Sequence, residues 1–135
     1  MNINTALSFD AIEFNLGIDS LTSSKGISTG VLDPTKGMYW AWHSGFINLK
    51  LEGKSNLSTT KKQFFQFNLG GFRNGFYNIQ TIQLNTKKSL QINVSVDIFK
   101  FLSSIDLQKE NHIMTPSKHA VELAKKAVTM FSIKN

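Results

Sequence analysis

The sequence predicts an all-β domain, an antiparallel β-sandwich of the Greek-key or immunoglobulin-like type, with a short C-terminal helix. Three observations support this prediction. Segments in which apolar and polar residues alternate recur at short spacing along the chain. The 135 residues include 11 Phe, a residue that favours half-buried pleated surfaces. One stretch near the C-terminus shows the helical period instead.

The N-terminal part predicts one strand and one long loop. From Ile12 to Ile18, apolar residues alternate with polar residues or glycine, which is the period of a half-buried strand. The stretch 19–36 is rich in Ser, Thr and Gly and contains Asp33-Pro34, a turn signal. We therefore expect a strand followed by a long surface loop, of the kind that is usually functional or flexible.

Two strands are predicted in the middle of the chain. Apolar residues alternate over 47–51, and this strand ends at Gly53. They alternate again over 65–69, where Gly70-Gly71 closes the strand. The polar run between the two strands predicts their connection.

Two more strands follow. The fourth strand changes phase between Ile79 and Ile82, which predicts a bulge near residues 80–81. Residues 85–88 predict a hairpin-like turn into the fifth strand, over 90–98, where the alternation is clearest. About five strands are few for two packed sheets, so we expect that strands are missing from this chain.

The C-terminal stretch predicts a helix. Thr115 is a suitable N-cap, and Pro116 then occupies the first helical position. Glu122 and Lys126 are spaced as a favourable i,i+4 ion pair. The apolar face at helical spacing comprises Val121, Ala124, Val128 and Phe131. A shorter helical turn is expected within 97–105.

Charge and hydropathy argue against two classes of partner. The formal net charge is +6, but the lysines are scattered and Arg73 is the only arginine, so no nucleic-acid partner is predicted. No apolar run approaches the roughly 18 residues of a membrane span. The first residues lack the basic start and apolar run of a signal peptide, so the chain is either cytoplasmic or a form from which the export signal is missing.

No enzyme is predicted. The chain has no cysteine, which excludes disulfides, thiolate metal sites and cysteine nucleophiles. The 9 acidic residues include no pair placed as in a glycosidase, and the sequence contains no nucleophile elbow. Gly70-Gly71 lacks the lysine and the strand-to-helix context of a phosphate-binding loop.

One short run concentrates unusual residues. GMYWAWHSG, residues 37–45, contains both tryptophans of the chain, Trp40 and Trp42, followed by His43. Two indoles spaced two apart on an extended segment point to the same face and bury a large apolar area. The pair is therefore a structural anchor at the edge of the sandwich, a sugar-stacking platform, or an indole that is chemically modified beside a metal.

The histidines differ in their surroundings. His43 is either a surface or hydrogen-bonded loop histidine, or a metal ligand, because neutral imidazole suits copper and zinc. His112 lies in a loop without an evident partner, and His119 lies on the polar face of the predicted helix, where we expect it to be solvated.

The run GMYWAWHSGFINLKLEG resembles the signature of the MbnP-like family, copper-binding β-sandwich proteins encoded beside methanobactin systems and widespread in other bacteria. That signature joins a Pro, a Gly-Met and an aromatic residue to Trp-x-Trp-x-Ser-Gly-aromatic, here from Pro34 to Phe46. FQFNLGGF is similar to the family's second signature, and NVSVDIFKF and HIMTP are similar to its C-terminal part. The resemblance covers nearly the whole chain.

The resemblance implies an exported protein, periplasmic, secreted or surface-attached as a lipoprotein, that binds copper. In the copper-binding relatives, histidines hold the metal together with a kynurenine, which a di-haem peroxidase-type partner makes from a tryptophan. Matched by position, Trp40 or Trp42 is the kynurenine precursor and His43 contributes an imidazole. Asn68 stands where the second signature often has the ligating His, and an amide is a poor copper ligand beside an imidazole.

The family domain is normally longer, so residues 1–135 are expected to form a single domain that lacks the family's N-terminal strands. Two functional hypotheses follow. The first is an exported, non-catalytic copper-binding or copper-handling protein that uses His43 and a tryptophan-derived group. The second is a β-sandwich interaction module for protein or carbohydrate, in which the tryptophan motif is a structural anchor.

Overall fold

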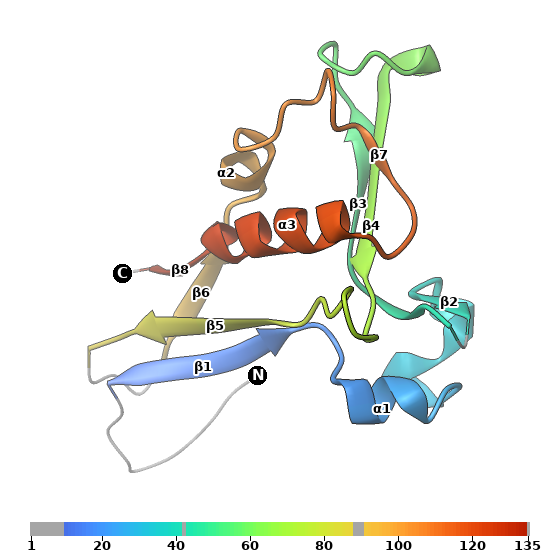
Figure 1. The fold of residues 1–135 in the computed structure, drawn as a ribbon. Coiled ribbons are helices and arrows are strands. Elements are labelled where there is room, and N and C mark those ends of the chain that lie inside the picture. The colour runs from blue at the N-terminus through green and yellow to red at the C-terminus, as the bar shows by residue number, and fades with distance from the viewer. Residues whose placement is uncertain (1–9, 42, 88–90, 135) are drawn as a thin grey trace.

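A computed structural model describes residues 10–41, 43–87 and 91–134 (Figure 1). The strands in these ranges are β1 (Ala11–Leu16), β2 (Tyr39–Ala41), β3 (Gly45–Lys54), β4 (Phe64–Gly70), β5 (Gln80–Asn85), β6 (Asn93–Val96), β7 (His112–Ile113) and β8 (Phe131–Lys134). The α-helices are α1 (Ser20–Ser24), α2 (Ile98–Leu102) and α3 (Lys118–Ala127).

The strands form one four-stranded sheet and two pairs. The larger sheet has the order β2-β3-β4-β7 and is antiparallel except between β4 and β7. β1 pairs with β5 and β6 pairs with β8, both antiparallel. Figure 1 shows α3 running from the β3–β4 hairpin towards β6 and β8. The predicted all-β, sandwich-like fold with a short C-terminal helix is confirmed.

The β3–β4 hairpin supplies much of the core. Leu49 pairs with Leu69, and both Leu69 and Phe67 are fully buried, as the alternation predicts. Gly53 pairs with Phe65, and a Cβ on Gly53 would lie 2.6 Å from Cζ of that ring. The glycine that ends the predicted strand therefore makes room for an aromatic side chain.

Helices α2 and α3 cover the core side of β4. Phe101 of α2 meets Phe67 edge to face, with 6.3 Å between the ring centroids. Asp97 caps α2 by accepting a hydrogen bond from the backbone N of Lys100 at 3.1 Å, so the helical turn predicted within 97–105 is confirmed. The buried residues of α3 are Ala120, Leu123, Ala124 and Ala127. No helix in the described part of the chain is long and apolar enough to cross a membrane.

Helix α3 begins and ends at other residues than predicted. Its N-cap is Ser117 and not Thr115, because the Ser117 Oγ accepts a hydrogen bond from the backbone N of Ala120 at 3.0 Å. Pro116 therefore precedes the cap. The α-helix ends at Ala127, so the predicted face is wrong beyond that residue, and Phe131 instead begins β8.

The predicted pair of Glu122 and Lys126 makes no direct ion-pair contact. The hydrogen bond and charge of Lys125 lower the pKa of Glu122, and the positive charge of Lys126 only adds to them. Glu122 Oε1 pairs with the Nζ of Lys125 at 2.8 Å, an i,i+3 contact. The Nζ of Lys126 donates instead to the carbonyl oxygen of Ser104 at 3.0 Å, because the end of α2 lies beside this side of the helix. Lys126 thus ties α3 to the segment after α2.

Strand β5 differs from the predicted fourth strand. It begins at Gln80, so the change of phase between Ile79 and Ile82 marks the start of a strand and not a bulge. β5 pairs with β1, and β6 pairs with β8, so the predicted hairpin pairing across 85–88 is wrong for the described residues. Lys88 lies outside the described residues.

The predicted surface loop 19–36 contains regular turns. It includes α1 and two short 3-10 helices at Gly30–Leu32 and Pro34–Lys36. A backbone hydrogen bond from Thr22 lowers the pKa of Asp19, the cap of α1, from its ordinary value of 3.8. A hydroxyl hydrogen bond from Thr35 lowers the pKa of Asp33 in the same way.

Candidate functional site

The aromatic run folds as the β2–β3 hairpin. Tyr39 of β2 pairs with Phe46 of β3, and Ala41 pairs with Gly45. His43 lies in the turn between these pairs. The run is therefore a strand and a turn rather than one extended segment.

Trp40 lies half-buried against the end of β4. A Cβ on Gly70 would overlap the carbonyl oxygen of Phe46 and would lie 3.0 Å from Cζ3 of the Trp40 indole. The indole therefore packs on the bare backbone of Gly70 and joins β2 to β4 across β3. Trp42 lies outside the described residues, so the expectation that the two indoles share a face stays a prediction.

On the other face of β2, the Tyr39 side chain contacts Phe46. Its ring centroid lies 4.9 Å from that of Phe46, which is only 3% exposed. Successive side chains of a strand project to opposite faces, so Tyr39 and Trp40 fix β2 from two sides. The Tyr39 hydroxyl is buried without a hydrogen-bond partner among the described residues.

His43 is exposed and lines an open groove of 280 Å³ beside the turn. The other lining residues come from the turn, from the stretch after β4 and from the residues before α3. They are Ser44, Gly71, Phe72, Arg73, Phe76, Thr115 and Pro116. Sequence reasoning missed this groove because it joins segments that lie far apart in the chain and share no motif.

Two glycines with positive φ make room for the walls of the groove. Gly45 has φ +70°, and a Cβ there would lie 2.6 Å from Cδ1 of the Phe72 ring. Gly71 has φ +120°, and a Cβ there would lie 2.7 Å from the carbonyl oxygen of Phe76. A side chain at either position would displace a wall, besides straining the backbone.

The stretch after β4 carries Arg73, the positively charged side chain among the residues that line the groove. Phe76 N donates to the carbonyl oxygen of Arg73 at 2.9 Å, which closes a β-turn with Gly75 at φ 84°. The Arg73 guanidinium lies over the Phe72 ring, with Cζ 5.9 Å from the centroid. The turn therefore holds a cation and an aromatic ring together at the edge of the groove.

Asn68 is buried in β4 with 4% of its surface exposed. It pairs with Lys50 of β3, and its Oδ1 has no hydrogen-bond partner among the described residues. Because side chains alternate along a strand, Asn68 projects from the face of β4 that Trp40 covers at Gly70. The structure thus brings Asn68 and Trp40 to one face, whereas His43 lines a groove that Asn68 does not line.

Metal ions in proteins are held by clusters of ligating side chains. The described residues contain no group of three or more His, Cys, Asp or Glu that could hold a metal ion. His112 is exposed on β7. His119 is exposed, as expected, but it is not merely solvated, because its Nε2 lies 3.1 Å from Oε2 of Glu110 and would form an ion pair there when protonated. Within the described ranges, His43 belongs to no such group.

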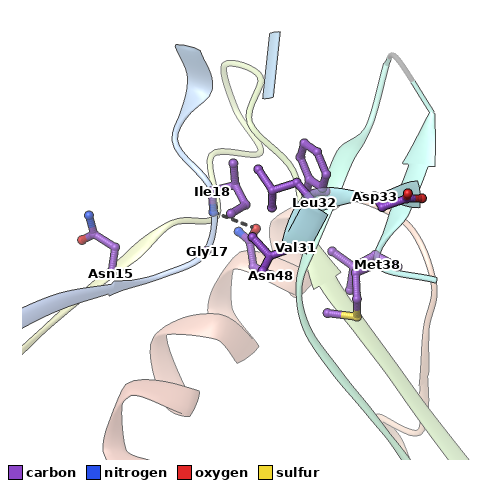
Figure 2. Close-up of a pocket in the computed structure, with 10 residues that line it drawn as sticks. Asn15, Gly17, Ile18, Val31, Leu32, Asp33, Met38 and Asn48 are labelled. Carbon is purple, nitrogen blue, oxygen red and sulfur yellow. Dashed lines mark hydrogen bonds between the residues drawn. The ribbon is translucent and has the colours of Figure 1, made fainter. Parts of the chain in front are cut away.

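A second cavity, of 320 Å³, lies between the end of β1, the 31–33 turn and the start of β3 (Figure 2). Asn48 bridges its walls: its Oδ1 accepts from the backbone N of Ile18 at 3.2 Å, and its Nδ2 donates to the carbonyl oxygen of Asn78 at 3.1 Å. A Cβ on Gly17 would overlap this amide. Sequence alternation places Asn48 on a polar face and does not foresee this bridging role.

No curated protein and no solved structure matches the chain. A family model does: the model described as MbnP matches residues 1–116 of the 135. The match takes in the β2–β3 hairpin, β4 and the whole groove up to Pro116, and it ends just before α3. The resemblance carried by the tryptophan motif is thereby confirmed, and this chain belongs to the MbnP family.

Proposed function

We propose that this chain is a non-catalytic interaction module in which the tryptophan motif is a structural anchor. MbnP domains are of a non-catalytic type, and membership of the family suggests a copper-related or binding role. The observation that carries the proposal is the packing of Trp40 on Gly70, because this contact uses the indole to hold the hairpin in place. This anchoring role of the indole requires no set of metal ligands.

The position of the β2–β3 turn supports a binding role. β2 is held by Phe46 on one face and by Gly70 on the other, so the turn that carries His43 has a defined place beside the groove. The groove volume of 280 Å³ lies just below the range for ligand pockets, about 300–1,000 Å³. It suits one or two side chains of a protein or one sugar ring.

Copper handling is the second candidate function, and family membership favours it. In this case His43 offers an exposed imidazole, and Trp40 or Trp42 is the precursor of a kynurenine made by a di-haem peroxidase-type partner. Asn68 in place of a His counts against it, as does the lack of a three-ligand group in the described part of the chain.

The MbnP family is associated with extracellular and periplasmic proteins. We extend this association to the chain and propose that it works outside the cytoplasm, in the periplasm or at the cell surface. Fractionation of the native cells with an antibody against the chain tests this location, and recovery only in the cytoplasmic fraction contradicts it.

If the chain is an interaction module, it should bind a ligand, and this binding should depend on the residues of the groove. A displayed peptide library and a glycan array provide the probes, and the Phe76→Ala variant removes an exposed wall of the groove. The matched control is His112→Ala, an exposed position outside the groove. A binder lost in F76A and kept in H112A supports the proposal. The absence of any binder, or equal loss in both variants, contradicts it.

Copper handling predicts a different result. After incubation with copper and desalting, metal analysis should find one equivalent retained by the wild type and by H112A but not by His43→Ala. For protein produced by the native organism, mass spectrometry of the intact chain should show the mass increase that accompanies conversion of one tryptophan to kynurenine. Stoichiometric copper that depends on His43 would make this second candidate the function. Unmodified mass without retained copper would eliminate it.

A further inference from the structure

We infer that the groove beside the β2–β3 turn receives an acidic peptide segment of a partner protein. A carboxylate of the segment pairs with the Arg73 guanidinium, and an adjoining apolar side chain packs between Phe76 and Pro116. The inference rests on the proposed interaction module and names the chemistry of its partner.

Arg73 is free to bind an anion. It is the only arginine of the chain and is exposed. Within the described ranges its guanidinium has no carboxylate within ion-pair distance and no hydrogen-bond acceptor, and its one contact is the Phe72 ring at 5.9 Å. A guanidinium presents paired N–H donors that match a carboxylate, and stacking on a ring leaves those donors available.

The charge around the groove favours an anionic ligand. No acidic residue lines the groove in the part of the chain that the structure describes. The net charge of +6 adds an attractive long-range field for a negatively charged segment. A neutral sugar gains nothing from this field, which is why a peptide carboxylate fits the site better.

The groove keeps its shape without a ligand. Ser20 Oγ donates to the carbonyl oxygen of Phe72 at 3.2 Å, and Asn78 N donates to that of Gly71 at 3.1 Å. Asn78 Nδ2 also donates to the carbonyl oxygen of Gly70 at 3.2 Å. Because the stretch after β4 is fixed at both ends, binding does not have to order it, which improves affinity.

The apolar part of the groove accommodates a side chain. Phe76 is 39% exposed, so one side of its ring faces solvent in the free protein. Pro116 and the Phe72 ring complete the apolar walls, and the hydroxyls of Ser44 and Thr115 provide polar groups at the rim. A peptide with an apolar residue next to an acidic one can therefore fill the apolar part of the groove and also pair with Arg73.

The second cavity does not offer such a site. Its amide at Asn48 already bonds to Ile18 and Asn78, and the carboxylate of Asp33 accepts from Thr35. Its polar groups are thus engaged within the fold, whereas the guanidinium of the groove is not.

The test is an NMR titration of the full chain with synthetic peptides. The probes are blocked Gly-Ser peptides that carry Glu-Leu-Glu at the centre, with Gln-Leu-Gln and Lys-Leu-Lys versions as charge controls. The Glu peptide should bind at least about tenfold more tightly than the Gln peptide, since hydrogen bonds to charged groups contribute that much. The shifted signals should come from residues 71–76 and 115–116.

Two matched variants test whether the carboxylate of the peptide binds at Arg73. Arg73→Gln should abolish the preference for Glu over Gln. Lys54→Gln should keep it, although Lys54 is likewise an exposed cation over a ring, 5.1 Å from the centroid of Phe64. Lys54 does not line the groove, so equal effects of both variants would mean general charge attraction and would overturn the inference.

Further outcomes separate this inference from the proposed function. Equal binding of the Glu and Gln peptides, with loss in F76A, overturns the acidic partner and leaves the interaction module standing. Tighter binding of a heparin fragment or of phosphatidylglycerol vesicles through Arg73 overturns the peptide as occupant. Peptide-independent copper retention through His43 overturns the interaction module itself.

Discussion

Gly70 and Trp40 meet at the end of β4, where the indole packs on a backbone that carries no side chain. Two residues earlier on the same face, Asn68 buries an Oδ1 that lacks a partner in the described structure, at a cost of about 1–3 kcal/mol. The alternation of β4 predicts which side chains enter the core, but it does not predict that the opposite face is covered as well. At Gly70 that cover comes from the Trp40 indole of β2, the strand that the hairpin turn places beside β3.

Gly70→Ala should therefore destabilise the protein. The new Cβ would overlap the carbonyl oxygen of Phe46 and would crowd Cα of Ile47 and the Trp40 indole. We expect a loss of about 3 kcal/mol in the free energy of unfolding, measured by chemical denaturation.

Gly30→Ala is the matched control for this variant. A Cβ at Gly30 meets nothing within 4 Å, but the residue has φ +69°, so only backbone strain of roughly 1–2 kcal/mol is added. If G70A costs no more than G30A, Trp40 does not anchor the hairpin against β4.

At the scale of secondary structure, capping decides where α3 starts. Both Thr115 and Ser117 are good N-cap residues, and the sequence favours Thr115 because Pro116 follows it. The structure selects Ser117, while Thr115 and Pro116 line the groove instead. The chain thus uses the segment before the helix for the candidate site, which local pattern alone does not indicate.

Ser117→Ala should lower the free energy of unfolding by about 1 kcal/mol, because the backbone N of Ala120 loses its acceptor. Thr115→Ala should change stability by less than about 0.5 kcal/mol, because an exposed side chain away from a cap contributes little. Thermal and chemical denaturation of both variants measure the difference. A larger loss in T115A than in S117A would place the cap at Thr115.

For the whole molecule, the fold brings together three segments that the sequence keeps apart: the β2–β3 turn, the stretch after β4, and residues 115–116. α2 and α3 cover the opposite face of β4 and complete the core. That residues 1–135 form one domain without the family's N-terminal strands stays a prediction.

Acid should destabilise the whole protein through its hydrogen-bonded carboxyls. The pKa is lowered, chiefly by hydrogen bonds, in Asp19, Asp33, Asp106 and Glu122. The ordinary values are 3.8 for the three Asp and 4.5 for Glu122, so below about pH 4.5 the unfolded chain binds more protons than the folded one. The stabilisation is present above these values and is lost as the pH falls through the lower, folded pKa values.

Chemical denaturation between pH 6 and about pH 3 measures this effect. The double variant Asp19→Asn, Asp33→Asn should keep its stability at pH 6, since both carboxyls are helix caps and Asn also caps helices, and should lose less stability in acid. An unchanged slope of stability against pH in this variant would contradict the role of these carboxyls.

The sequence by itself determined the strand periods over 12–18, 47–53 and 65–69, the C-terminal helix, and the family signature around Trp40, because each depends on residues that are neighbours in the chain. Tertiary structure alone decided that Trp40 packs on Gly70 on the face of β4 that carries Asn68, and that His43, Arg73 and Pro116 line one groove. These relations depend on which strands pair and on how the β2–β3 turn folds back. Local periodicity carries no information on contacts between distant segments.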